Sequence, residues 1–241
     1  MIRLTLDQGN TYTKLSLFHN EKLKEHLVLS DPELKPAIVK MFSENNIHST
    51  IFSTVRNDSR KLNSMLSGPR IIQLTHQLKF PFQIRYSTPD TLGTDRLANC
   101  AGALKNYPDK DCLIVDCGTC ITYTLVEKKN LMGGTISPGI DMRFEALHHF
   151  TGRLPLVEDR NSWPELIGNS THGSIRSGVL RAIIAETDGM ISQYCSQNSD
   201  LIVILTGGSL PMFEAHLKSP IFAAPFLTPE GLHEILLLNE E

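Results

Sequence analysis

The stretch LTLDQGNTYTKLSLF, Leu4 to Phe18, places an acid, a glycine and an asparagine between two apolar runs of β-prone residues. The stretch LIVDCGTCITYTLV, Leu113 to Val126, repeats this arrangement about 110 residues later. Residues 12–18 alternate between apolar and polar after a Gly-Asn turn signal, which is typical of the returning arm of a β-hairpin. The chain therefore contains the same strand–turn–strand unit twice.

The hydrophobic spacing around the two stretches predicts the same succession of elements in each half. In the first half we expect strands over 2–6, 12–18, 22–29, 50–55 and 71–74 and helices over 32–45, 59–66 and 91–107, with Asp31 as N-cap of the first helix. In the second half we expect strands over 112–115, 121–126, 130–136 and 201–205 and helices over 141–150, 173–194, 212–217 and 231–238. This repeat predicts an α/β fold of two duplicated domains, residues 1–108 and 109–241, with a ligand cleft between them.

Composition and charge favour an ordinary globular protein. The chain has 241 residues, a net charge of -3, 41% hydrophobic residues and 20% charged residues. The chain has no excess of basic residues that would favour nucleic-acid binding. No apolar run approaches the roughly 18 residues of a membrane-spanning helix. The N-terminus enters a strand pattern without the features of a signal peptide, so we expect a cytoplasmic protein with neither nucleic acid nor membrane as partner.

Two other features have a structural and a functional interpretation. The chain has five cysteines, and Cys117 and Cys120 form a lone C-x-x-C. This pair could be half a zinc site or a redox pair, but without a second pair it is better interpreted as two small residues flanking a turn. Arg143 and Arg153 follow a Ser-Pro-Gly turn and could touch a substrate or partner, although surface salt bridges are the favoured interpretation.

The first Asp-x-Gly turn, Asp7 to Thr11, suits phosphate chemistry. Gly9 permits a tight turn, whose backbone N–H groups can cradle phosphate oxygens. A carboxylate such as Asp7 beside phosphates is the usual way to hold Mg²⁺, directly or through water. Lys14 follows three residues after the turn and can reach the same anion. A plain β-hairpin is the alternative for this motif taken alone.

The second turn, Asp116-Cys117-Gly118-Thr119, supports the phosphate interpretation because it opens the other half. Thr206-Gly207-Gly208-Ser209 follows a very apolar strand, and its glycine pair permits close approach of an adenosine group. Taken alone, this motif is better interpreted as a plain strand-to-helix turn. Together the three motifs resemble those of the superfamily of acetate and sugar kinases, heat-shock chaperone ATPases and actin. That resemblance implies two ribonuclease H-like domains with ATP bound between them.

A narrower resemblance rests on YSTPDTLGTDRLAN, Tyr86 to Asn99, together with DQGNTYTK, DCGTCITY and GGTISPG. Their order and spacing resemble those of type III pantothenate kinases, which open coenzyme A biosynthesis in bacteria by phosphorylating pantothenate with ATP. The resemblance covers essentially the whole chain, with the least signal in roughly the last 30 residues. It implies ATP and pantothenate as ligands and a homodimer whose active sites lie at the subunit interface.

The resemblance also implies roles for individual residues. ATP would be bound by Asp7, Gln8, Gly9, Asn10, Thr11, Tyr12, Thr13, Lys14 and Thr119. Pantothenate would be bound by Tyr86, Gly93, Thr94, Asp95, Arg96 and Thr171, the last near the subunit interface. Asp95 corresponds to the general base and Arg96 to the residue that grips the substrate. Asp7 would lie near Mg²⁺, and Asp116 would bind a monovalent cation, K⁺ or NH₄⁺.

Elementary chemistry agrees with these roles. Asp95 can accept the proton of a primary hydroxyl while that oxygen attacks the γ-phosphorus, and an adjacent arginine can pair bidentately with a substrate carboxylate. Phosphoryl transfer otherwise depends on positioning and charge neutralisation. The chain departs from the family at Gln8, Thr94 and Thr124, none of which the mechanism requires. Two alternatives remain open: a kinase of the same superfamily acting on another small hydroxy acid, and a non-catalytic nucleotide-binding regulator.

Overall fold

The structure is a computed structural model that describes residues 1–56, 59–159 and 162–240. The chain forms two compact units. The first comprises Met1–Lys110, Val126–Gly133 and Phe226–Glu241, and the second comprises Asp111–Leu125 and Gly134–Pro225. The C-terminal helix therefore packs with the N-terminal half of the chain, while the domain division at residues 108 and 109 stays a prediction.

The first unit is built on a five-stranded sheet. Its strands are β1 (Ile2–Gln8), β2 (Thr13–His19), β3 (Lys22–Leu29), β4 (Ile47–Thr54) and β5 (Ile71–Gln73), in the order β3-β2-β1-β4-β5. β1 to β3 form an antiparallel meander, and β4 and β5 add in parallel. A helix follows β3 and another follows β4, because a parallel strand can be reached only through such a crossover.

A second sheet, formed mainly by the second unit, repeats this strand order. It contains the strands β7 (Cys112–Cys117), β8 (Cys120–Glu127), β9 (Asn130–Pro138), β10 (Ile202–Thr206) and β11 (Phe222–Ala223). The end of β8 and the start of β9 belong to the first unit. These five strands lie in the order β11-β10-β7-β8-β9, with β10 parallel to β7 and β11 parallel to β10, and the short strand β6 (Gln83–Ile84) adds a sixth strand beside β9. Counted from the first strand of each unit, both sheets have the order 3-2-1-4-5. The predicted duplication of an α/β fold is confirmed by this topology.

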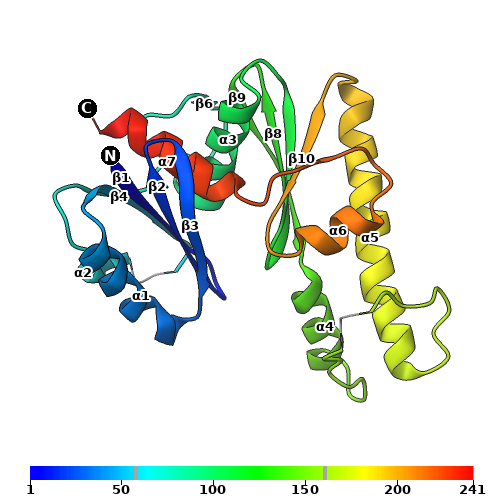
Figure 1. The fold of residues 1–241 in the computed structure, drawn as a ribbon. Coiled ribbons are helices and arrows are strands. Elements are labelled where there is room, and N and C mark those ends of the chain that lie inside the picture. Colours follow the sequence, from blue (N-terminus) through cyan, green and yellow to red (C-terminus); the bar gives the residue numbers. More distant parts are fainter. Residues whose placement is uncertain (57–58, 160–161, 241) are drawn as a thin grey trace. The chain divides into compact units, whose positions relative to one another are not determined.

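Helices cover both faces of the sheet in the first unit (Figure 1). α1 (Asp31–Glu44) and α2 (Ser59–Met65) pack Leu34, Ile38 and Leu62 against the inward residues of β1 and β4. Because side chains alternate along a strand, Arg3 and Thr5 face the other way, where α7 (Leu227–Asn239) lies. His233 of α7 stacks on Phe18 of β2, with ring centroids 4.3 Å apart.

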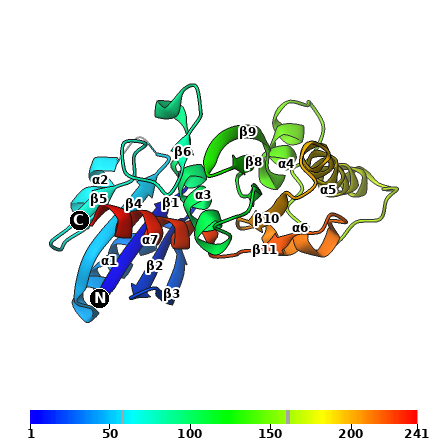
Figure 2. The same cartoon turned by 90° about the horizontal axis from the view of Figure 1, so that it is seen from above.

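α7 also lies beside α3 (Thr94–Asn106), as Figure 2 shows. The two helices approach closely at Gly231, where an added Cβ would stand 1.7 Å from the carbonyl oxygen of Ala98. A short 3₁₀ turn, η1 (Pro89–Thr91), precedes α3, so the helix begins three residues later than the periodicity predicts. The short strand β6 (Gln83–Ile84), which the sequence did not indicate, pairs with the start of β9.

The prediction that Asp31 caps α1 is wrong. Ser30 is the N-cap residue, and its backbone N–H donates to Glu33 Oε2 over 2.9 Å. Serine followed by glutamate three residues later is the pattern of a capping box. Asp31 instead lies in the first turn, where Arg56 Nη1 donates to both of its carboxylate oxygens over 2.8 Å.

The second unit carries α4 (Ile140–His149), α5 (Thr171–Gln197) and α6 (Leu210–His216). α5 and α6 bury Ile183, Ile191 and Phe213 against the apolar residues of β7, β8 and β10. The N-terminal half of α5 packs separately on α4, through a small cluster around Phe144 and Val179. Within the described residues, no helix has the length and hydropathy required to cross a membrane.

Candidate active site

The first Asp-x-Gly turn joins β1 to β2 in the first unit. Its backbone is closed by the N–H of Gly9, which donates to the carbonyl oxygen of Tyr12 over 3.0 Å. Asp7 lies opposite Lys14 in the β-ladder, and its Oδ2 is 3.9 Å from Lys14 Nζ. Ser53 Oγ donates to Asp7 Oδ1 over 2.8 Å. The predicted carboxylate and ammonium group therefore meet at the end of the sheet.

Gln8 faces away from Asp7 because neighbouring residues of a strand point to opposite faces of the sheet. Thr54 Oγ1 donates to Gln8 Oε1 over 2.8 Å, and the N–H of Val55 donates to the Gln8 carbonyl oxygen over 3.1 Å. The Gln8 side chain thus joins β1 to β4. The Thr13 side chain is also buried, so neither of these two side chains is exposed at the turn.

The second group of predicted residues surrounds the N-terminus of α3. Gly93 is the N-cap residue, and the N–H of Arg96 donates to Asp95 Oδ1 over 2.8 Å. A Cβ on Gly93 would lie 2.4 Å from that same carboxylate oxygen, so only glycine leaves room for Asp95 in this conformation. A carboxylate in the first turn of a helix is stabilised in its ionised form by the helix dipole.

Arg96 is 3% exposed, although arginine is almost never fully buried without a partner. Its guanidinium carbon lies 5.6 Å from the centroid of the Tyr86 ring. The ring of Tyr86 in turn lies against Gly133, 3.5 Å from where a Cβ would stand. Tyr86, Gly93, Asp95 and Arg96 are therefore brought together in one unit, as predicted.

The Asp116–Thr119 turn is enclosed by two other loops of the second unit. Gly207 has φ +98°, and a Cβ there would stand 2.5 Å from Asp116 Oδ1. The N–H of Ser209 donates to the Cys117 carbonyl oxygen over 2.9 Å. From the other side, the N–H of Gly139 donates to the Thr119 carbonyl oxygen over 3.0 Å. The predicted adenosine loop and cation loop are thus in direct contact.

The C-x-x-C pair flanks this turn. Cys117 ends β7 and is buried, and Cys120 begins β8. Burial, together with the charge of Asp116, raises the pKa of the Cys117 thiol well above its ordinary value, which disfavours the thiolate that metal binding and redox exchange require. The described part of the chain holds no cluster of three or more metal-ligating side chains of the histidine, cysteine or carboxylate type. The structural interpretation of the pair is supported.

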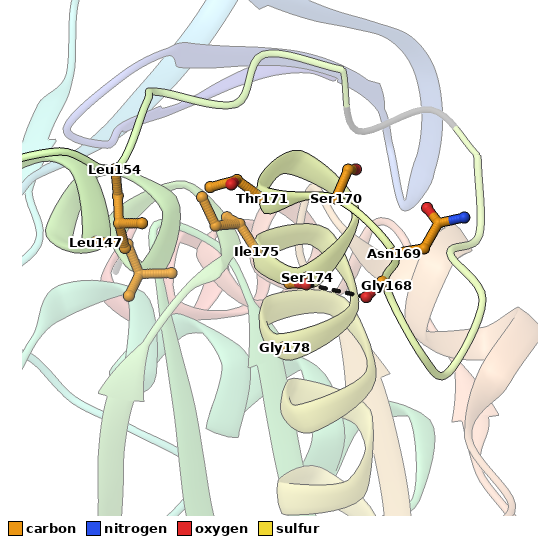
Figure 3. A pocket seen from close by; sticks show the side chains of 9 residues that line it. All are labelled: Leu147, Leu154, Gly168, Asn169, Ser170, Thr171, Ser174, Ile175 and Gly178. Carbon is orange, nitrogen blue, oxygen red and sulfur yellow. Dashed lines mark hydrogen bonds between the residues drawn. The ribbon is translucent and has the colours of Figure 1, made fainter.

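Thr171 lies in a pocket of the second unit with a volume of about 680 Å³ (Figure 3). It is the first residue of α5, and the preceding Ser170 caps the helix by accepting from the N–H of Gly173 over 3.1 Å. Ser174 Oγ donates to the Gly168 carbonyl oxygen over 3.2 Å, which holds the incoming loop against the helix. The pocket is lined by Leu147, Leu154, Gly168, Asn169, Ser170, Thr171, Ser174, Ile175 and Gly178.

Two arginines hold the predicted loops in place. Arg143 Nη2 donates to both carboxylate oxygens of Glu186 over 2.8 Å, and its Nε donates to the Pro138 carbonyl oxygen over 2.9 Å. The favoured interpretation of Arg143 as a salt-bridge residue is confirmed. The second arginine, Arg56, was not predicted as a site residue; its Nε donates to the Gly9 carbonyl oxygen over 2.8 Å. No local pattern marks Arg56, because only the pairing of β1 with β4 brings it to the turn.

Comparison with known structures supports the fold. The structure is similar to a protein described as a conserved putative Baf family transcriptional activator from Campylobacter jejuni, with a TM-score of 0.60, 20% identity and 98% of each chain covered. It is also similar to a ROK hexokinase from Thermus thermophilus, with a TM-score of 0.52, 14% identity, and 99% of this chain and 98% of that chain covered. At such identities the similarity concerns the fold alone, and it agrees with the predicted duplicated ribonuclease H-like architecture.

Comparison of sequences identifies the family. A family model described as type III pantothenate kinase matches residues 3–193. A relative named type III pantothenate kinase from Christiangramia forsetii is 41% identical, with 99% of each chain covered. The match spans the Asp7 turn, the Asp95 segment and the Asp116 turn. The chain therefore belongs to the type III pantothenate kinase family.

Proposed function

We propose that this protein transfers the γ-phosphoryl group of ATP to the primary hydroxyl of pantothenate, forming 4′-phosphopantothenate at the first step of coenzyme A biosynthesis. The observation that carries this proposal is the arrangement of Asp95, Arg96 and Tyr86 around the start of α3, in a chain that matches the family over its whole length. A base, a carboxylate-binding cation and an aromatic wall are the groups that pantothenate requires.

Asp95 acts as the general base. Its Oδ1 is held by the backbone N–H of Arg96, and the N-terminus of α3 favours its charged form. The carboxylate accepts the proton of the pantothenate hydroxyl as that oxygen attacks the γ-phosphorus and the bond to the β-phosphate oxygen breaks. In a loose transition state this proton transfer follows the approach of the nucleophile, so the position of Asp95 matters more than its basicity.

Arg96 and Tyr86 orient the substrate. The Arg96 guanidinium can donate two parallel hydrogen bonds to the pantothenate carboxylate, which fixes the far end of the molecule and thus its hydroxyl. The face of Tyr86 holds the guanidinium in place through a cation–π contact. Thr171 would add a hydroxyl contact to the same substrate from the neighbouring subunit.

The Asp7–Lys14 segment would bind the phosphates of ATP. Oxygen ligands suit Mg²⁺, and Asp7 presents a carboxylate whose orientation is fixed by Ser53. The ion would supply charge neutralisation on the phosphate oxygens. Lys14 adds a cation close to the same oxygens. Asp116 likewise presents a carboxylate, beside carbonyl oxygens of its own turn, which suits K⁺ or NH₄⁺, and Thr119 would contact ATP.

A homodimer with active sites at the interface completes the proposal. Phe150, Leu166 and Ile167 are 81%, 70% and 84% exposed, which is unusual for three large apolar side chains close together in one region of a sequence. They flank, along the chain, the segments that line the Thr171 pocket. A second copy covering these side chains would bring its own residues to that pocket.

The test measures ADP release from MgATP with and without pantothenate, in K⁺ and then in Na⁺, beside an Asp95→Asn variant. We expect turnover that requires pantothenate and K⁺ and that falls at least about a hundredfold in the variant. Tight nucleotide binding without pantothenate-dependent turnover would instead favour a regulator, and turnover with a different hydroxy acid would favour another kinase of the superfamily.

The dimer is tested separately by light scattering on the purified protein. An Ile167→Glu variant places a charge in the proposed interface, so we expect a monomer that has lost pantothenate-dependent activity but still binds nucleotide. A monomeric wild-type protein with full activity would contradict the interface.

A further inference from the structure

We propose that Arg56 is a positioning residue for the ATP-phosphate turn. It holds the carbonyl groups of Gly9 and Asn10 on one side, so that the N–H groups of the same two peptide units, those of Asn10 and Thr11, are presented to the phosphates. The inference rests on the proposed function, since it assumes that this turn receives a nucleotide. It adds a residue that lies outside the Asp7–Lys14 segment and follows the end of β4.

All three nitrogen atoms of the Arg56 guanidinium group donate hydrogen bonds. Nε donates to the Gly9 carbonyl oxygen over 2.8 Å, and Nη2 donates to the Asn10 carbonyl oxygen over 3.0 Å. Nη1 donates to both oxygens of Asp31 over 2.8 Å. One side chain therefore connects the phosphate turn to the first turn of α1, across a sequence separation of 46 residues from Asn10.

The carbonyl groups of three consecutive residues point toward the end of β4. The Gln8 carbonyl accepts from the N–H of Val55 over 3.1 Å, and the next two carbonyls accept from Arg56. Successive peptide groups with their carbonyls fixed on one side must direct their N–H groups elsewhere. A row of such N–H groups is the usual cradle for an anion.

The N–H groups of the turn remain available as donors. The Gly9 N–H closes the turn onto Tyr12. In the described residues no hydrogen bond is recorded for the backbone N–H of Asn10, Thr11 or Tyr12, and all three residues are exposed. The carbonyl groups of Gln8, Gly9 and Asn10 thus have donors within the protein, whereas these N–H groups lie on exposed residues, which is the polarity that a phosphate ligand needs.

Arginine is required because the role depends on a planar fork. A lysine ammonium could replace one of these hydrogen bonds but could not donate to two adjacent carbonyls and a carboxylate at fixed angles. Asp31 acts through Arg56, since both of its carboxylate oxygens accept from Nη1 and thereby help to orient the guanidinium group. Asp31 also offsets the positive charge, so Arg56 contributes geometry to the site more than net charge.

The experiment compares Arg56→Ala and Arg56→Lys with the wild-type protein by calorimetric titration of MgADP and by steady-state kinetics. We expect the dissociation constant of MgADP and the KM for ATP to rise about tenfold or more in Arg56→Ala, with a smaller rise in Arg56→Lys. The KM for pantothenate should stay within about twofold, because the residues around Asp95 are not touched.

Arg3→Ala is the matched control. Arg3 also makes a bidentate pair with a carboxylate of the same unit, Glu240, with both N–O distances 2.7 Å, but it makes no recorded contact to the turn among the described residues. We expect Arg3→Ala to lower the melting temperature while leaving both KM values unchanged. If the two alanine variants change nucleotide affinity equally, the role of Arg56 is merely structural and the proposal fails.

Two further measurements separate positioning from folding. Ethylguanidine at millimolar concentration should restore part of the MgADP affinity of Arg56→Ala, and not of Arg3→Ala, because it can occupy the vacated site. Adding Asp31→Ala to Arg56→Ala should cause no further loss of affinity. Unchanged MgADP binding in Arg56→Ala would overturn the proposal, whereas a wild-type protein that binds MgADP but ignores pantothenate would overturn only the proposed substrate.

Discussion

The guanidinium of Arg96 lies over the ring of Tyr86, 5.6 Å from the ring centroid, although the two residues belong to different segments and Arg96 is almost completely buried. The face of an aromatic ring attracts a guanidinium group electrostatically, which favours this placement of the Arg96 side chain. The same arrangement leaves the arginine pre-oriented for a carboxylate ligand. This is the pair to which the proposed function assigns the carboxylate end of pantothenate.

Replacing Arg96 by lysine should raise the KM for pantothenate by about ten- to a hundredfold, because an ammonium group cannot form the bidentate pair. The KM for ATP should change little. Tyr86→Leu should raise the pantothenate KM less, since it removes a cation–π contact of about 0.5–2 kcal/mol but leaves the charge. Steady-state kinetics with each substrate varied in turn checks both variants, and an equal rise in the two KM values would contradict the assignment.

Gly139→Ala should damage the Asp116–Thr119 turn. A Cβ at this position would stand 2.3 Å from the Thr119 carbonyl oxygen and 2.5 Å from the Gly118 carbonyl oxygen, both of which are backbone atoms. We expect a loss of about 1–3 kcal/mol in the free energy of unfolding and a higher KM for ATP. Urea denaturation and kinetics measure these two effects.

Gly152→Ala provides the control for that substitution. No heavy atom lies within 4 Å of a Cβ built on Gly152. Its free energy of unfolding should change by no more than about 0.5 kcal/mol, with unaltered kinetics. A similar loss in both variants would mean that the effect comes from helix or loop propensity rather than from the contact with the turn.

Asp116→Asn should abolish the proposed dependence of turnover on a monovalent cation. The neutral amide lacks the negative charge with which the carboxylate attracts a cation from solution. Stimulation of turnover by K⁺ relative to Na⁺ should therefore disappear. An increase of the wild-type melting temperature with K⁺ concentration should also be lost, which measures binding without turnover. Asp109→Asn, at an exposed position, should retain both effects.

The stability of the first unit should depend on His233 below neutral pH. The ring is fully buried against Phe18. Burial, with Lys105 and Arg3 nearby, lowers the pKa of His233 from 6.5 to about 4. Above about pH 6.5 the residue is neutral in both states and contributes no pH dependence. As the pH falls from about 6.5 to about 4, the unfolded chain binds a proton that the folded chain does not, so stability decreases.

The largest expected loss from this residue is about 3 kcal/mol, which follows from the difference between the two pKa values. A His233→Phe variant keeps an aromatic ring against Phe18 and cannot take up the proton. The difference in free energy of unfolding between the variant and the wild-type protein should therefore change in favour of the variant between pH 6.5 and pH 4. Parallel curves over this range would contradict the role of His233.

Local sequence patterns determined the type and order of most elements. Period-2 and period-3.6 spacing depend on neighbours a few residues apart, so the helices and strands were predicted to within a few residues, and the repeated Asp-x-Gly turn marked the duplication. The Gly93–Arg96 segment was recognised through the resemblance of its sequence to the family, and not from its local pattern alone. The wrong N-cap prediction at Asp31 also concerns neighbouring residues. Ser30 and Asp31 are both good N-cap residues, and the hydrogen bond from Ser30 to the Glu33 side chain decides in favour of Ser30.

Contacts between distant segments were decided only by the tertiary structure. Parallel pairing of β1 with β4 places Arg56 at the Gly9–Asn10 turn, and the return of the chain after β9 places Gly139 against Thr119. Arg3 and Glu240 meet across 237 residues for the same reason. A sequence motif can indicate that a turn will bind phosphate. Which side chain holds the carbonyl groups of that turn depends on which strand pairs with β1 in the sheet and where that strand ends.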